Sequence, residues 1–137
     1  MGREDLVKLI ESDDEAFFVG KLTDDKIEFC EKSLNVILPE SFKWFLKEYG
    51  TGGMNGVEII GGGLAQVPSC VESTKDWRQY GLPNKLVIVE DNGEWQYCLN
   101  TEKMKDGECP VVDWEQGAGI GEKKYSNFYE FLIQRFS

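Results

Sequence analysis

The sequence predicts one compact domain that combines amphipathic helices with antiparallel strands. Its length of 137 residues suits a single domain with a single core. Hydrophobic residues make up 41% and charged residues 29%, a balance typical of a soluble globular protein. Apolar residues recur at helical spacing in several segments, whereas another segment alternates on either side of an Asn-Gly turn.

Two helices are predicted in the first third of the chain. Residues 3–11 carry a short apolar stripe at helical spacing, formed by Leu6, Val7 and Ile10. A second helix begins after Thr23, whose hydroxyl can cap backbone N–H groups, and ends at Asn35, which tolerates the left-handed conformation. Its predicted buried face is Ile27, Cys30 and Leu34.

A third helix is predicted after Pro39, with an apolar stripe that ends before Gly50. That stripe consists of Phe42, Phe45, Leu46 and Tyr49. The glycine-rich residues 51–56 are expected to form a flexible loop, and residues 57–60 a short strand before a second glycine loop. A further helix is expected over residues 69–80.

The clearest strand signal is a hairpin whose arms are residues 86–90 and 95–99. Asn92-Gly93 supplies the positive φ angles of a tight turn. Period two places Trp95, Tyr97 and Leu99 on one face, and Gln96 and Cys98 on the other. Residues 110–115 are predicted to form another strand, and Ser126 to cap a terminal helix. The apolar side of that helix is Phe128, Phe131, Leu132 and Phe136.

Charge and composition exclude several function classes. The chain has no histidine, so imidazole triads, Cys-His dyads and HExxH zinc sites are impossible. Its net charge of −10 disfavours direct binding of nucleic acid, because phosphate binding depends on lysine and arginine. The acidity is dispersed along the chain, which favours either solubility or the attraction of a basic partner.

The cysteines and termini indicate the compartment. The four cysteines form no CxxC pair and fit no zinc or iron–sulfur spacing, so we interpret them as reduced. The first residues lack a basic stretch followed by an apolar one, and no apolar run approaches a membrane span. We therefore expect a cytoplasmic protein that does not contact a membrane.

Neither glycine-rich segment satisfies a nucleotide-binding motif. In residues 50–56 and 117–122, Asn55 and Glu122 stand where GxGxxG requires its third glycine. This favours flexible loops at both places. Serine and cysteine nucleophiles have no histidine base, and the clustered acids lie in contexts where water should solvate them. No catalytic residue, cofactor or metal site is predicted. Binding of a small ligand through the glycine loops stays open as an alternative.

Six residues form the predicted partner-binding set. Acids flank the Asn92-Gly93 turn, and two more share one face of the strand over residues 110–115, with a tryptophan between them. Aromatic groups beside carboxylates suit a protein-binding surface, where they act as anchors and as partners for arginine or lysine. The set is Glu90, Asp91, Glu94, Asp113, Trp114 and Glu115.

The stretch from Leu22 to Gly50 resembles the opening signature of the SUKH superfamily, the cell-wall-assembly-regulator-like domains. A helix is followed by the joint Leu38-Pro39-Glu40-Ser41-Phe42 and by a second helix ending in Tyr49-Gly50. The resemblance continues to the terminal helix and covers about residues 22–137 of one SUKH-like domain, residues 1–137. Residues 103–112 are most similar to the YobK-like bacterial members.

The resemblance implies an α+β fold, with a mostly antiparallel sheet on which helices pack, and no catalytic residues. It also implies a cytosolic immunity protein, or antitoxin, that neutralises a cognate basic toxin, often a nuclease, by stoichiometric binding. It transfers no contact residues, because the signature positions are mostly core ones. A general interaction or scaffold domain is the alternative role that the eukaryotic relatives suggest.

Overall fold

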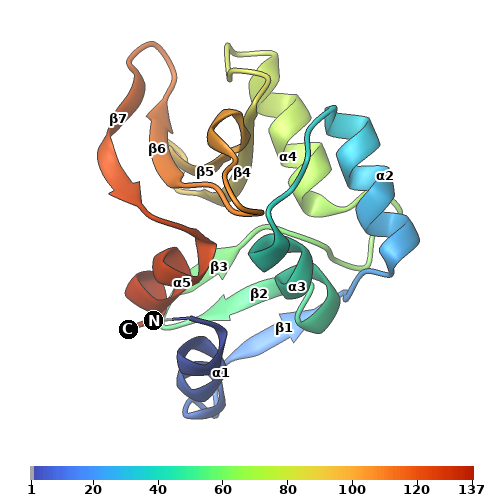
Figure 1. Ribbon diagram of the computed structural model, residues 1–137, viewed down its shortest axis with the longest axis vertical. Helices are drawn as coiled ribbons and strands as arrows, with labels where there is room; N and C mark the ends of the chain where they lie inside the picture. Colours follow the sequence, from blue (N-terminus) through green and yellow to red (C-terminus); the bar gives the residue numbers. More distant parts are fainter. Residues whose placement is uncertain (1) are drawn as a thin grey trace.

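The fold is α+β, as predicted, with two antiparallel sheets and five α-helices in the described chain (Figure 1). A computed structural model describes residues 2–137. The elements in chain order are α1 (Arg3–Glu11), β1 (Phe17–Val19), α2 (Asp24–Leu34), α3 (Glu40–Glu48), β2 (Thr51–Met54), β3 (Val57–Ile59), α4 (Ser69–Arg78), β4 (Leu86–Asp91), β5 (Gln96–Asn100), the 3-10 turn η1 (Thr101–Lys103), β6 (Val111–Glu115), β7 (Gly119–Tyr125) and α5 (Phe128–Phe136).

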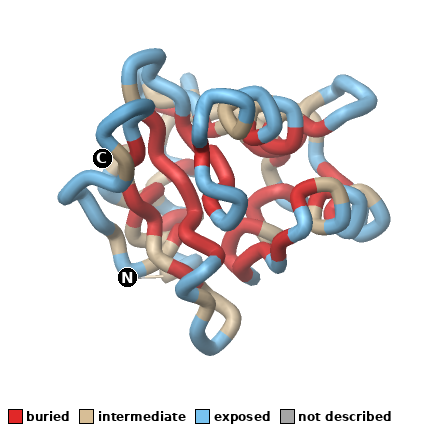
Figure 2. Tube along the Cα trace, turned by 90° about the horizontal axis from the view of Figure 1, so that it is seen from above, coloured by how far each residue is buried: buried red, intermediate tan, exposed pale blue. Residues whose placement is uncertain are grey.

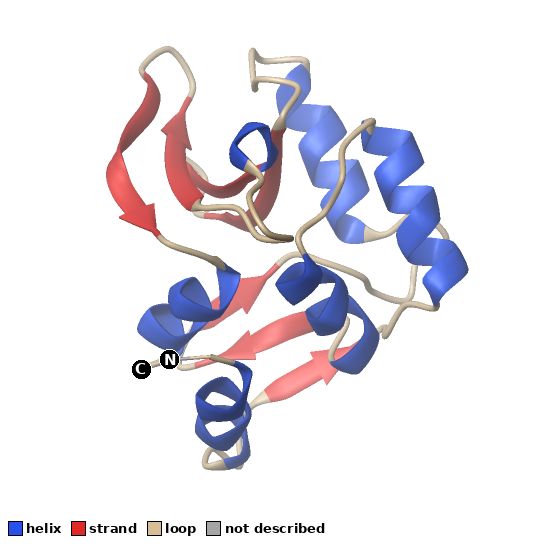
Figure 3. Cartoon of the chain, in the orientation of Figure 1, coloured by secondary structure: helices blue, strands red, loops and turns tan. Residues whose placement is uncertain are grey.

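The first sheet has the order β1-β2-β3 and the second the order β4-β5-β6-β7. The backbone N–H of Ile60, just after β3, donates to the carbonyl of Val89 in β4 at 2.7 Å and joins the two sheets. In Figure 3, α3 and α5 lie in front of the first sheet, α4 lies beside the second, and α2 lies against α4 on the side away from that sheet. Each sheet therefore has helices against it.

The main core lies between the first sheet, the helices and one face of the second sheet. The predicted apolar stripes of α2, α3 and α5 all enter it, and the four predicted residues of α5 are fully buried. A smaller cluster on the other face of the second sheet contains Cys98 and Trp114, with Trp77 of α4 against it. The buried trace forms the centre of the molecule and exposed loops surround it (Figure 2).

Side-chain caps begin two of the helices, and a left-handed residue ends one of them. Thr23 accepts a hydrogen bond from the N–H of Lys26, and Asn35 adopts the left-handed conformation that ends α2, as predicted. The terminal helix is capped by Asn127, which accepts from the N–H of Glu130, and not by Ser126 as expected. The difference is one residue, and either side chain can accept this bond.

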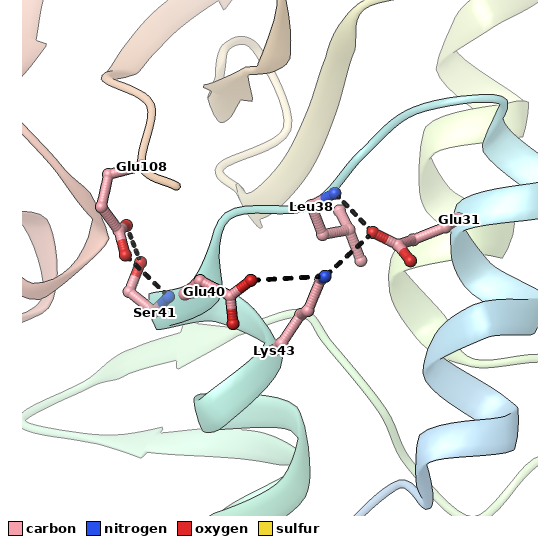
Figure 4. Close-up of polar contacts among 6 residues, drawn as sticks. All are labelled: Glu31, Leu38, Glu40, Ser41, Lys43 and Glu108. Carbon is pink, nitrogen blue, oxygen red and sulfur yellow. Dashed lines mark hydrogen bonds and ion pairs between the residues drawn. The ribbon is translucent and has the colours of Figure 1, made fainter. Parts of the chain in front are cut away.

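The carboxylate of Glu108, in a loop distant in sequence, accepts hydrogen bonds from the first turn of α3 (Figure 4). Glu108 accepts hydrogen bonds from the N–H and the hydroxyl of Ser41 at 3.0 and 2.5 Å. Glu31 of α2 accepts from the N–H of Leu38 and pairs with Lys43. Because a carboxylate is stabilised at a helix N-terminus, these contacts fix α3 against α2 and against the segment that precedes β6.

Three strands were not predicted, namely β1, β2 and β7. The expected loop at residues 51–56 forms β2 and its turn into β3, and β2 pairs with β1 on one side and with β3 on the other. The glycine-rich segment at residues 117–122 leads into β7, which pairs with β6. The hairpin is confirmed, but of its two turn residues only Gly93 has positive φ, and the N–H of Asn92 donates to the carbonyl of Trp95. The turn is therefore longer than a two-residue one.

Candidate protein-binding surface

The second sheet gathers the predicted acids at one of its ends. Both hairpin turns, residues 92–95 and 116–118, lie there, because β4, β5, β6 and β7 alternate in direction. Asp91 pairs with Gln96, and Gln96 in turn pairs with Trp114. Four of the six predicted residues have side chains with exposed surface at this end, which we call the acidic end: Asp91, Glu94, Asp113 and Glu115.

Asp91 is held in place by three donors. Its carboxylate accepts from the indole N–H of Trp77 at 2.9 Å, from the amide of Gln96 at 3.0 Å and from the N–H of Gly93 at 2.8 Å. Partial burial raises the pKa of Asp91, but these three hydrogen bonds outweigh it and hold the pKa below its usual value. The ionised carboxylate thus ties the hairpin turn to α4.

We expect Asp91→Asn to destabilise the protein at neutral pH more than at acidic pH. A folded-state pKa below the unfolded one stabilises the fold above about pH 3.9, and that contribution is lost as the pH falls through the folded value. The loss at pH 7 should be about 1 kcal/mol, since the residue is exposed and water screens it. Urea unfolding of both proteins at pH 7 and pH 3 measures the difference. An equal loss at the two pH values would show that the charge of Asp91 does not contribute.

The other three acids of the acidic end differ in exposure and in hydrogen bonding. Asp113 is half-buried and accepts from the N–H of Lys123 at 3.0 Å, where the β6–β7 register shifts. Glu94 and Glu115 are exposed. Within residues 2–137, none of the four acids forms an ion pair with lysine or arginine. Their charge is therefore available to a partner.

Glu90 does not belong to this surface. It is only 3% exposed, although turn acids were expected to be solvated. Arg135 of α5 binds its carboxylate with two hydrogen bonds, from Nε at 2.9 Å and from the terminal nitrogen at 2.6 Å. The side chain of Glu90 forms an internal ion pair with Arg135 and has almost no exposed surface. Glu90 is therefore not part of the contact set.

Trp114 also leaves the contact set. It is 3% exposed, and its ring meets that of Trp77 edge to face at a centroid separation of 6.0 Å. The face of the sheet that carries Trp114 is covered by α4, so the residue belongs to the smaller core. The expectation of an aromatic anchor between two acids is therefore wrong for this residue.

A groove beside Asp91 was missed. It has a volume of about 330 Å³ and runs between α4 and the loop over residues 60–67. Glu72 and Asp76 line it from α4, and Leu64 on the loop is 83% exposed. Lys26 fixes the loop by donating to the carbonyl of Gln66 at 2.7 Å. The i, i+4 spacing of the two acids on a predicted helix was the available signal.

Comparison with known proteins places the chain in a family. The family model described as SMI1-KNR4 cell-wall, one of the SUKH models, matches residues 3–137. The chain belongs to the SUKH family. The sequence resemblance is thereby confirmed at the level of the superfamily, and the match extends it to include α1.

The SUKH chain also has a similar solved structure. A crystal structure of a protein from Pseudomonas syringae pv. tomato aligns with a TM-score of 0.77 over 98% of each chain, at 18% sequence identity. At this identity the likeness supports the fold alone. No helix within residues 2–137 of the SUKH chain has the length and apolar character to span a bilayer.

The cysteines of the SUKH chain are buried and free. Burial raises the pKa of Cys109 to about 12 and raises that of Cys98 further. Because the thiolate is the reactive form, these two side chains are not nucleophiles at neutral pH. Within the described residues, no group of three or more Cys, Asp or Glu side chains is placed to hold a metal ion.

Proposed function

We propose that this SUKH protein is a cytoplasmic immunity protein, an antitoxin that binds a cationic toxin domain with nuclease activity and blocks it stoichiometrically. The observation that carries the proposal is the acidic end, where four acids with exposed surface lie on or beside the two hairpin turns and no described lysine or arginine pairs with any of them. Lys123, the base nearest in sequence to the β6–β7 turn, lies over the ring of Trp95 at 4.8 Å instead. Binding, and not bond-making, is the proposed activity.

Coulomb attraction explains why such a surface suits a nuclease. A nuclease must be basic where it holds phosphate, and this chain carries a net charge of −10. An acidic protein that covers the phosphate-binding surface competes with the nucleic acid for the same charges. The groove beside Asp91 adds apolar surface at Leu64, which can exclude water from the contact.

The test is charge reversal at the two free acids. Glu94→Lys combined with Glu115→Lys should slow association with the toxin domain about tenfold at low ionic strength and flatten the salt dependence. The matched control is Glu48→Lys with Glu102→Lys, which changes the net charge equally at two exposed acids. Glu102 lies at the opposite end of the second sheet.

The measurement is stopped-flow association with the C-terminal domain encoded by the neighbouring open reading frame, together with rescue of cell growth on co-expression. Slower association of the first double variant, with the control unchanged, supports the acidic end as the contact surface. Equal association by both variants would place the contact elsewhere. Absence of binding and of rescue by the unaltered protein would reject the antitoxin role itself.

A further inference from the structure

A hollow lies on the outer face of the first sheet, and none of the described residues that line it belongs to a helix. Antiparallel pairing places Phe18, Gly52 and Ile59 in one row across the strands, and Phe17, Gly53 and Glu58 in the next. Phe18 meets Phe45 of α3 and Phe136 of α5, at ring centroid separations of 6.0 and 6.3 Å, so its row faces the core. The row that contains Phe17 therefore faces away from α3 and α5, toward solvent.

On β1 this solvent-facing side of the sheet is apolar, where a sheet surface is ordinarily polar. Phe17 is 68% exposed and Val19 beside it is half-buried. Together with the β2–β3 turn they line a hollow of about 630 Å³. An exposed aromatic side chain at the edge of a hollow is costly to leave in water and is typical of a site that a partner covers.

The floor of the hollow is bare backbone. Gly52 and Gly53 lie in it, and a Cβ atom on either would come within 2.1 Å of the carbonyl oxygen of Phe17 or 1.7 Å of that of Val57. Close strand pairing thus requires both glycines. The consequence is that no side chain rises from the outer face between Phe17 and Glu58, so an extended segment can approach the backbone of β2 there.

Carboxylates form the rim. Asp13, Glu15 and Glu58 line the same hollow, and within residues 2–137 none of them pairs with a lysine or arginine. Asp13 accepts from the N–H of Glu15 at 2.8 Å, which fixes the turn that carries both acids. The rim repels phosphate and attracts cations, so its charge selects a basic protein segment over a nucleic acid.

We propose that this face binds an extended, arginine-containing segment of a protein partner, as a second interaction surface apart from the acidic end. Arginine fits because its planar guanidinium stacks on an aromatic ring and at the same time donates to carboxylates. Phe17 supplies the ring, and Glu15 and Glu58 supply the carboxylates. The proposal does not depend on the identity or existence of a toxin.

The probe is the peptide acetyl-Gly-Arg-Gly-Arg-Gly-amide, titrated into the ¹⁵N-labelled protein and followed by NMR. The matched control peptide replaces both arginines with citrulline, which has the same shape without the charge. We expect amide shifts concentrated in residues 13–19 and 51–58, and at least fivefold weaker binding of the citrulline peptide. Shifts confined to other residues, or equal binding of both peptides, would overturn the proposal.

Variants separate this surface from the acidic end and from a structural role. Phe17→Ser, and Glu15→Gln combined with Glu58→Gln, should each weaken arginine-peptide binding at least fivefold, whereas Glu94→Lys with Glu115→Lys should leave shifts at residues 13–19 unchanged. Phe17 lies across from Gly53 and could instead only shield that glycine. In that case Phe17→Ser would lower the melting temperature while the carboxamide variant bound the peptide normally, and the proposal would fail.

Discussion

Replacing Glu90 with alanine is expected to lower the free energy of unfolding by about 3 kcal/mol. The carboxylate is almost fully buried and holds Arg135 through two hydrogen bonds. Its removal leaves Arg135, whose side chain is 28% exposed and whose guanidinium lies over the ring of Tyr97 at 5.5 Å, without a carboxylate partner. The lower end of the range for broken buried pairs applies, because that exposure lets water reach the charge. Guanidinium chloride unfolding measures the loss.

Glu94→Ala is the control, since an exposed acid in the same hairpin should change stability by about 0.5 kcal/mol or less. The double variant Glu90→Leu with Arg135→Met should recover part of the loss, because it replaces both charges with apolar groups. If Glu90→Ala unfolds like the unaltered protein but no longer binds a partner, Glu90 is a contact residue and not a structural one.

The burial of Glu90 shows why the sequence misplaced a site residue. Strict alternation along β4 would put Glu90 on the same face as Ile88. The register shifts between these two residues, so that Glu90 pairs with Tyr97 and Asp91 with Gln96. The bulge thereby turns Glu90 toward α5 and leaves Asp91 with Trp77. Its counter-ion Arg135 lies 45 positions away, beyond the reach of any local pattern.

Local signals were sufficient for the helices. The structure gives α1 the predicted residues 3–11, and α2 the predicted cap and left-handed end. These features depend on the side chains of a few neighbouring residues, which a sequence displays directly. Which face of a strand a helix covers is a long-range property. Period two correctly set Trp114 apart from its neighbouring acids, but nothing in the sequence indicated that α4 would bury it.

The glycine-rich segment was misread for a related reason. Glycines are the local signal of a loop, whereas alternating apolar residues are the local signal of a strand. The centre of β2 consists of two glycines, so it carries only the loop signal. Its strand character comes from its neighbours, because β1 and β3 approach so closely that no other residue fits between them. Close approach of two backbones is visible only once the strands are assembled.

Gly52→Ala is therefore expected to destabilise the protein by about 3 kcal/mol. Its φ of +134° is a conformation that alanine rarely adopts, and the added Cβ would lie 2.1 Å from the carbonyl oxygen of Phe17. Backbone strain costs about 1–3 kcal/mol and the displacement of β1 a similar amount. Gly56→Ala isolates the strain, since Gly56 has a φ of +77° but no neighbour within 4 Å, and should cost about 1 kcal/mol. Equal losses for the two variants by urea unfolding would mean that β1 yields to the new methyl group, and that the close pairing of β1 with β2 does not require glycine at this position.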